Sequence, residues 1–180
     1  MKVLGLGGGL AAVLATARRA YAMPYYVYYP LPALTLPSPD SFPSATADDV
    51  WNSVKSVFGT EWEGMVALLD PSYRLPTDDA VAAFLQVDDT DGFPYIDTWG
   101  DCDDFAQVLQ GVFERGTWGY GFAFGQIGWW VPETGLGHMQ NIYINDARKV
   151  KLVEPQNDRI QEWGDILSLY PSARPFLIVI

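Results

Sequence analysis

The chain has 180 residues, of which 49% are hydrophobic and 14% aromatic, enough for the core of one domain with an appendage. Its 22 acidic residues against 11 basic ones give a formal charge of −11, which argues against a nucleic-acid partner and favours cations. One cysteine and one histidine exclude an intramolecular disulfide and zinc sites built from several such residues.

The N-terminal segment, residues 1–22, is an apolar, glycine-rich run after Lys2 that ends in the small-x-small pattern Ala-Tyr-Ala of a signal-peptidase site. Two arginines at positions 18 and 19 interrupt that pattern, and the run is shorter than the roughly 20 residues of a membrane span. The segment therefore fits a signal peptide, an anchor or a docked arm. A secreted, membrane-associated or virion-associated protein is consistent with each.

Residues 23–45 form a linker rich in proline and tyrosine, with six prolines that block regular helix and central strand. We expect an extended, semi-rigid arm that can dock on a protein partner or a membrane. The remaining residues, 46–180, are predicted to form one domain.

The first part of that domain has helical patterns. Apolar residues recur with helical spacing after Thr46, a plausible cap, and Gly59 stops the run. Further helices are expected over residues 61–69 and 78–85, followed by an acidic loop over residues 87–94.

A fourth helix is predicted to open at Cys102 and to end near Gly116. Strands are expected next, over residues 120–124 and 126–131, with a hairpin formed by residues 138–144 and 150–154. A last helix over residues 159–169 and a strand over residues 176–180 complete the order. Helices followed by an antiparallel sheet indicate an α+β fold.

Three residues in this order suit thiol chemistry. Cys102 in the first turn of a helix lies near free backbone N–H groups and the positive end of the helix dipole, which would lower the pKa of its thiol. His138 and Glu154 occupy opposite strands of the predicted hairpin, so that imidazole and carboxylate could meet at one end of the sheet.

Three sequence features together resemble a known group. They are Gly-Asp-Cys-Asp-Asp-Phe-Ala before a helix, Gly-His-x-x-Asn on a strand, and an acidic residue before proline on the next strand. They are similar to the papain-like and transglutaminase-like cysteine peptidase superfamily, over residues 46–180. Two branches are nearest, the calcium-dependent bacterial transglutaminase-like cysteine proteinases and the protease domain of the fairy-ring mushroom agglutinin family. Glu154 stands where the bacterial branch usually has Asp, and the agglutinin's sugar-binding domain has no counterpart here.

The resemblance implies a papain-like core and a catalytic triad in which Cys102 is the nucleophile, His138 the general base and Glu154 the orienting carboxylate. It also implies calcium, with Asp101 and Asp103 as ligands. The candidate substrate and oxyanion residues are Trp99, Asn141 and Gln156.

Each assignment has a structural alternative. Cys102 can be a buried small residue, His138 a hydrogen-bonded structural histidine, and the aspartates beside Cys102 helix caps. Asn141 and Gln156 can be scaffold residues.

Three functions follow. The first is a peptidase that cleaves amide bonds of a peptide or protein substrate through a Cys102 thioester. The second is an acyl transferase of the transglutaminase type, and the third is a non-catalytic structural or binding module, such as a virion or surface component.

Overall fold

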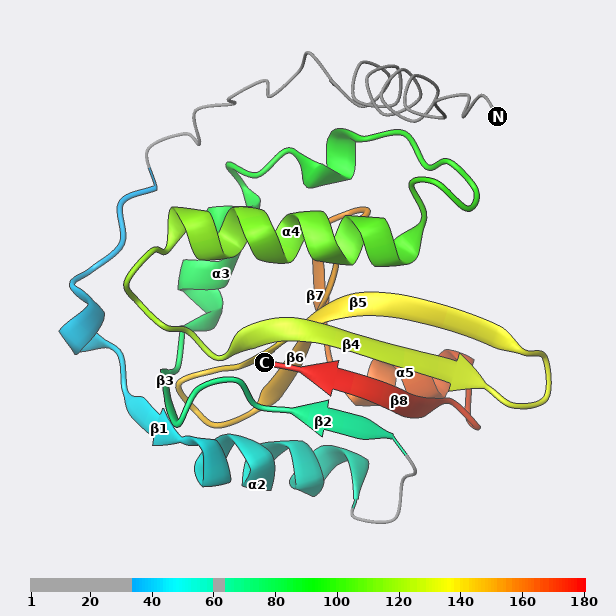
Figure 1. Ribbon diagram of the computed structural model, residues 1–180, viewed down its shortest axis with the longest axis horizontal. Coiled ribbons are helices and arrows are strands. Elements are labelled where there is room, and N and C mark those ends of the chain that lie inside the picture. Colours follow the sequence, from blue (N-terminus) through cyan, green and yellow to red (C-terminus); the bar gives the residue numbers. More distant parts are fainter. Residues whose placement is uncertain (1–33, 60–63) are drawn as a thin grey trace, which may run out of the picture. The chain divides into compact units, whose positions relative to one another are not determined.

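The computed structural model describes residues 34–59 and 64–180, so the predicted signal segment and residues 23–33 of the predicted arm lie outside the described residues. Figure 1 labels the elements. The helices are α2 (Ala47–Phe58), α3 (Asp78–Leu85), α4 (Cys102–Gly116) and α5 (Trp163–Leu169), with short 3₁₀ turns η1 (Pro39–Ser41) and η2 (Thr90–Gly92). The strands are β1 (Ser44–Thr46), β2 (Met65–Ala67), β3 (Ser72–Arg74), β4 (Phe124–Val131), β5 (Leu136–Ile144), β6 (Val150–Glu154), β7 (Arg159–Gln161) and β8 (Arg174–Val179).

Six of these strands form one sheet in the order β2-β8-β4-β5-β6-β7, and β1 pairs with β3 in a second, two-stranded sheet. Neighbouring strands are antiparallel except for β2 and β8, which are parallel. The predicted α+β class is confirmed. Within the described residues, no helix is both long and apolar enough to cross a membrane.

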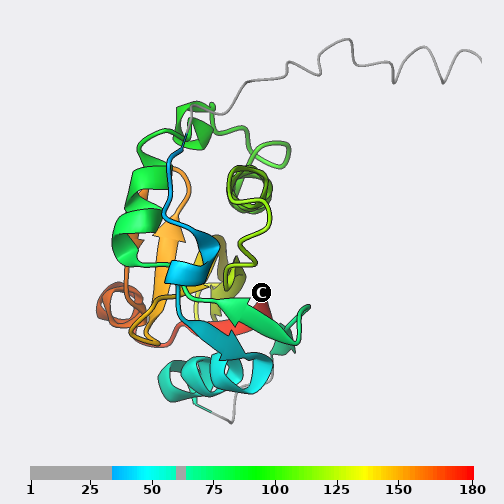
Figure 2. The same cartoon turned by 90° about the vertical axis from the view of Figure 1, so that its left-hand side faces the viewer.

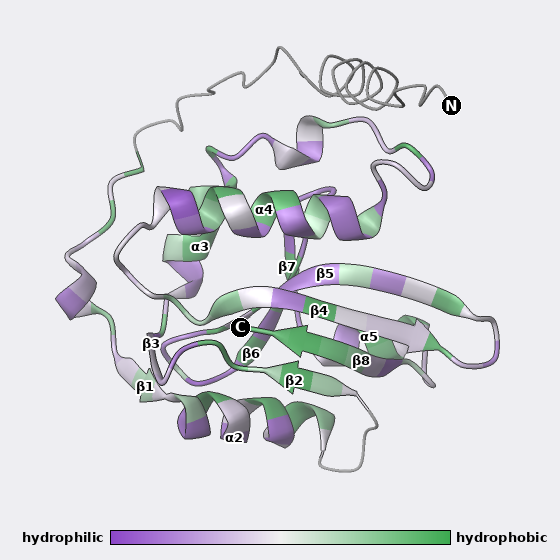
Figure 3. Cartoon of the chain, in the orientation of Figure 1, coloured by the Kyte–Doolittle hydropathy of each residue, from purple (hydrophilic) through white to green (hydrophobic). Residues whose placement is uncertain are grey.

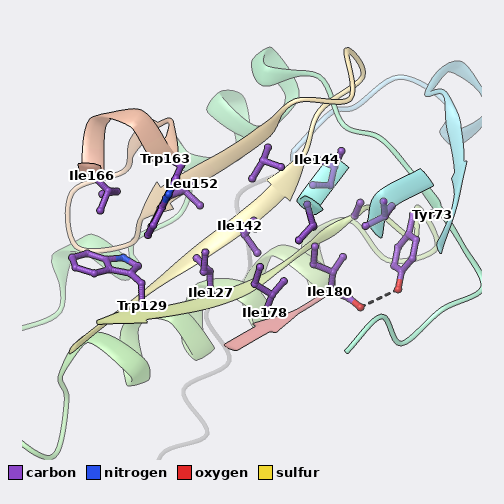
Figure 4. Packing of buried hydrophobic residues seen from close by; sticks show 14 of the residues in the cluster. Tyr73, Ile127, Trp129, Ile142, Ile144, Leu152, Trp163, Ile166, Ile178 and Ile180 are labelled. Atoms are coloured by element: carbon purple, nitrogen blue, oxygen red, sulfur yellow. Dashed lines mark hydrogen bonds between the residues drawn. The ribbon is translucent and has the colours of Figure 1, made fainter. Parts of the chain in front are cut away.

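The helices cover both faces of the six-stranded sheet, with α2 and α4 on opposite sides (Figures 1 and 2). One apolar cluster joins α2 and α5 to one face, and Figure 4 shows part of it, including Ile127, Ile142 and Trp163. A second cluster joins α3 and α4 to the other face through Leu109, Phe113 and other residues. Figure 3 shows hydrophilic and hydrophobic residues alternating along α2 and α4, as expected for helices with one buried face.

Several predicted boundaries are confirmed. The helix after Thr46 begins with a capping box formed by Thr46 and Asp49, and Gly59 follows its last residue with a φ of 79°. The predicted helices over residues 78–85 and from Cys102 are also present. The residues just before Thr46 belong to the packed domain as well, because Phe42 is buried and residues 44–46 form β1.

Three predicted elements are wrong. The helix over residues 61–69 is contradicted where it is described, because residues 65–67 form β2 and pair with β8. The helix over residues 159–169 starts only at Trp163, since residues 159–161 first pair with β6. The strand over residues 120–124 is replaced by an irregular segment in which Gly121 has a φ of 61°, and β4 begins at Phe124.

The C-terminal strand is tied to the earlier part of the chain beside β2. The hydroxyl of Tyr73 donates to the carbonyl of Ile180 at 2.9 Å and accepts from the backbone N–H of Asp70 (Figure 4). The backbone of Ile180 also bonds to Ala67 and Leu69. These bonds fix the edge of the sheet at which β2 and β8 meet.

Gly125 provides a test of this sheet. A Cβ at this position would lie 1.8 Å from the carbonyl oxygen of Val179, so Gly125→Ala should push β4 and β8 apart and lower the free energy of unfolding by roughly 1–3 kcal/mol. Gly111→Ala, on the exposed face of α4 with no atom near the added methyl group, should instead be neutral or stabilising. Urea unfolding of both variants measures the difference, and equal effects would contradict this account.

Candidate active site

His138 and Glu154 form a hydrogen-bonded pair between adjacent strands. His138 Nε2–H donates to Glu154 Oε2 at 2.7 Å, and both side chains are mostly buried. The antiparallel register of β5 and β6, in which Asn141 pairs with Val153, brings the two residues together. Since Nε2 is held by the carboxylate, Nδ1 is the ring nitrogen left to exchange a proton.

Two further side chains hold this pair in place. Gln140 Nε2 donates to the same Glu154 oxygen at 2.9 Å, and Trp129 Nε1 donates to Gln140 Oε1 at 3.0 Å. The Trp129 ring also meets the imidazole edge to face, with centroids 5.3 Å apart. The result is a chain of hydrogen bonds from a buried tryptophan to the histidine, which limits the orientations that the imidazole can adopt.

The pKa of Glu154 is lowered. Burial by itself would raise it, but the hydrogen bond and charge of His138, together with the Gln140 amide, outweigh burial. The carboxylate is therefore ionised at neutral pH and can stabilise a protonated imidazole.

Cys102 is the first residue of α4, as predicted. Its sulfur accepts a hydrogen bond from the backbone N–H of Met139, the residue after His138. The thiol therefore lies against β5 at Met139. Successive side chains of a strand point to opposite faces, so His138 leaves β5 on the face of Gln140, whereas α4 covers the face of Asn141. A contact between sulfur and imidazole requires the ring to reach around β5 where its pairing with β6 has ended.

Asn141 is a scaffold residue. It is fully buried, and its Nδ2 donates to the carbonyls of Ala106 in α4 and Gly125 in β4. Substrate cannot reach it, which corrects its assignment as a substrate or oxyanion residue. Its amide instead holds the helix that carries Cys102 against the sheet.

The thiol does not have the expected low pKa. Burial raises the pKa of Cys102, the charges of Asp101 and Asp103 add to the increase, and the Met139 N–H opposes it incompletely. The expected lowering of the pKa by the helix N-terminus is thus outweighed by burial and by the acidic residues beside the thiol. In this state the thiol is protonated at neutral pH.

Asp101 and Asp103 form an acidic pair at the start of α4. Asp101 caps the helix together with Asp104, so the structural alternative applies. The carboxyl of Asp103 shares a hydrogen bond with Asp101, which raises its pKa. The Oδ1 atom of Asp101 is buried without a hydrogen-bond partner, and ligand atoms of Asp101, Cys102 and Asp103 all lie within 4.8 Å of one another. An orphaned carboxylate oxygen in such a cluster fits a bound cation.

The two remaining candidates lie on either side of these groups. Trp99 precedes the helix and is 84% exposed. Gln156 lies in the turn after β6, and its backbone N–H donates to Glu154 Oε1 at 3.4 Å. Neither position tests a role in substrate or oxyanion binding.

Sequence analysis did not identify Gln140 or Trp129 as part of this hydrogen-bonded chain. Gln140 could have been found from strand geometry, because it is two residues after His138 and therefore on the same face of the strand. Trp129 lies directly opposite His138 in the β4–β5 register, but that register depends on the turn at residues 132–135 and was not predictable.

No protein-family model and no curated protein matches the chain. Among solved structures, PSL1a in complex with E-64 is similar, with 21% identity and a TM-score of 0.61 over 76% of this chain and 51% of that chain. A Polyporus squamosus lectin bound to a human-type influenza-binding epitope matches with 21% identity and a TM-score of 0.60, over 76% of this chain and 49% of that chain. The likeness is one of fold. The chain spans about half the length of these two chains.

The lowered pKa of Glu154 makes stability depend on pH. Its carboxylate stabilises the fold above its usual pKa of about 4.5, and this contribution is lost as the pH falls through the lower folded-state value. Glu154→Gln should therefore cost about 1–3 kcal/mol of unfolding free energy at neutral pH and progressively less in acid. Urea unfolding across this pH range tests it, with Asp146→Asn at an exposed site as control. A cost that does not change with pH would contradict the assignment.

Proposed function

We propose that the protein is a cysteine hydrolase of papain-like type that cleaves amide bonds in peptides. The observation that carries the proposal is the His138–Glu154 hydrogen bond, held by Gln140. The thiol, at the first position of α4, contacts the backbone N–H of Met139, the residue after His138. A nucleophile, a base and a group that orients the base are the parts that such chemistry needs.

In the proposed reaction, His138 Nδ1 takes the thiol proton as the Cys102 sulfur attacks the substrate carbonyl. The imidazolium, stabilised by Glu154, then gives that proton to the leaving amine, and an acyl thioester remains. Water, deprotonated by His138, attacks the thioester and releases the acid and the thiol. The backbone N–H of Cys102 and a donor from Trp99 or Gln156 would stabilise the oxyanion.

An amine in place of water would make the same machinery an acyl transferase. Either acceptor could attack the proposed thioester, and product analysis with an added primary amine distinguishes them. We take hydrolysis as the main proposal because water needs no second binding site.

The fold neighbours bear on this proposal in two ways. One is a complex with E-64, an epoxide that alkylates the thiolates of cysteine peptidases, which favours a reactive thiol on this fold. The other is a lectin bound to a sugar epitope, which favours a non-catalytic binding module. The raised pKa of Cys102 also supports a non-catalytic binding module, because a protonated thiol is a weak nucleophile.

Calcium is the proposed cofactor, with Asp101 and Asp103 as ligands. The orphaned Oδ1 of Asp101 supports this assignment, and carboxylate oxygens are ligands that calcium prefers. Calcium takes about six to eight oxygen ligands, so the two residues would supply part of its coordination shell. The ion would neutralise the carboxylates that face the thiol.

Hydrolysis tests the main proposal. The full chain should cleave a denatured protein such as casein in the presence of calcium, and Cys102→Ala or His138→Ala should lower the rate at least about a hundredfold. E-64 should add one equivalent to Cys102 in the wild type and react far more slowly with His138→Ala, as measured by mass spectrometry. Ser168→Ala, an exposed change far from these groups in the sequence, serves as control. Equal rates in the wild type and Cys102→Ala would favour the binding module.

Calcium binding has a test that does not depend on activity. Saturating calcium should raise the melting temperature of the wild type by several degrees, because a ligand that binds the folded state stabilises it. Asp101→Asn should abolish most of this increase, whereas Asp89→Asn, in the exposed acidic loop, should retain it. An unchanged melting temperature in the wild type would refute the calcium assignment.

A further inference from the structure

The loop that leads into Cys102 carries an unusual exposed surface. Residues 91–99 are all exposed, and four of them have large apolar side chains: Phe93, Tyr95, Ile96 and Trp99. In Figure 1 this loop projects beyond the end of α4 at which the helix begins. We call residues 91–99 the aromatic loop.

The aromatic loop has an ordered turn. The backbones of Ile96 and Gly100 exchange two hydrogen bonds of 2.9 Å, and the N–H of Trp99 also donates to the carbonyl of Ile96. Thr98, at the tip, has a φ of 73°, a conformation that costs energy for a residue with a branched side chain. The turn therefore presents Trp99 to solvent in a defined position, three residues before the thiol.

Acidic residues surround this apolar surface. The segment 87–104 contains seven aspartates and no lysine, arginine or histidine. The charges of Asp97, Asp101 and Asp103 act on Tyr95, and those of Asp101 and Asp103 also act on Cys102, so the aromatic loop and the thiol lie in one negative field. Burial raises the pKa of Asp158, in the turn after β6, and the charges of Asp91 and Asp88 raise it further. The three carboxyl groups therefore lie close enough to interact.

We infer that the aromatic loop is the docking surface for the substrate, and that the substrate is an extended peptide with an apolar or aromatic residue flanked by lysine or arginine. This inference rests on the proposed function and names its substrate class. An exposed tryptophan supplies a rigid anchor for an apolar side chain or a cation. The surrounding carboxylates select positive flanking charges and speed the encounter.

The charge pattern decides between this occupant and a membrane. An exposed aromatic loop can also insert into a lipid surface, but biological membranes attract basic rather than acidic segments. Seven aspartates around the loop oppose that contact. The position of Trp99 immediately before the nucleophile helix also suits a substrate, whose scissile bond must reach Cys102.

Trp118 offers a matched control for the test. It is 86% exposed, against 84% for Trp99, and it lies after the opposite end of α4.

Binding is measured by fluorescence anisotropy of a labelled peptide with a central phenylalanine and flanking lysines, on Cys102→Ala with calcium present. Trp99→Ala in that background should weaken binding about tenfold, as for loss of an aromatic anchor, while Trp118→Ala should not change it. A peptide with glutamates in place of the lysines should bind at least about tenfold more weakly, and Asp97→Lys should narrow that difference.

The same peptides serve as substrates for the protein with its cysteine intact. Trp99→Ala should raise KM for the lysine peptide more than it lowers kcat. Any of three outcomes would overturn the inference. The first is a loss of binding in Trp118→Ala equal to that in Trp99→Ala, and the second is equal affinity for both peptides. The third is Trp99-dependent binding to neutral or anionic lipid vesicles without peptide binding. Cleavage that ignores Trp99 and charge would refute the docking surface but leave the hydrolase in place. Trp99-dependent binding of the peptide without cleavage would refute the hydrolase but leave the docking surface in place.

Discussion

The alternation of side chains along β5 is the constraint on which the rest of the site depends. His138 and Gln140 lie on one face and reach Glu154, while Asn141 lies on the other and bonds to the backbone of α4. One strand thus presents His138 and Gln140 to the carboxylate of Glu154 on β6 and also holds the helix that carries the thiol. A slip of one residue in its register would exchange the two faces and break both sets of contacts.

The charge around Cys102 works against the thiol chemistry that we propose. A helix N-terminus and the Met139 N–H favour the thiolate, but burial and two adjacent carboxylates favour the thiol. The balance depends on whether Asp101 and Asp103 are neutralised. The cation that we propose at that position would neutralise both carboxylates and so favour the thiolate.

Much of this arrangement could be predicted from local sequence signals. Thr46 and Gly59 delimit α2, and the strands that carry His138 and Glu154 agree with the hairpin predicted over residues 138–144 and 150–154. The elements that could not be predicted depend on distant partners. Residues 65–67 form a strand because β8 is available to pair with them, and residues 159–161 do so because β6 is.

For the site, sequence named the histidine and the carboxylate that the structure brings together. It could not fix which face of β5 each side chain occupies relative to α4, nor the effect of burial on the thiol. It also misjudged Asn141, because an amide near a catalytic motif looks the same in sequence whether it faces the substrate or a helix carbonyl. Burial decides that question, and burial is a property of the packed fold.

The bond between Tyr73 and Ile180 spans 107 positions in the chain, and β2 lies beside β8 across a similar interval. Contacts between such distant positions form late, since the intervening loop must first be closed at an entropic cost. During synthesis, α4 and the β4–β5 hairpin can leave the ribosome well before β8, the strand that pairs with β2. The domain would then reach its final form only once residues through Ile180 have emerged, which delays completion of the site until translation has passed that point.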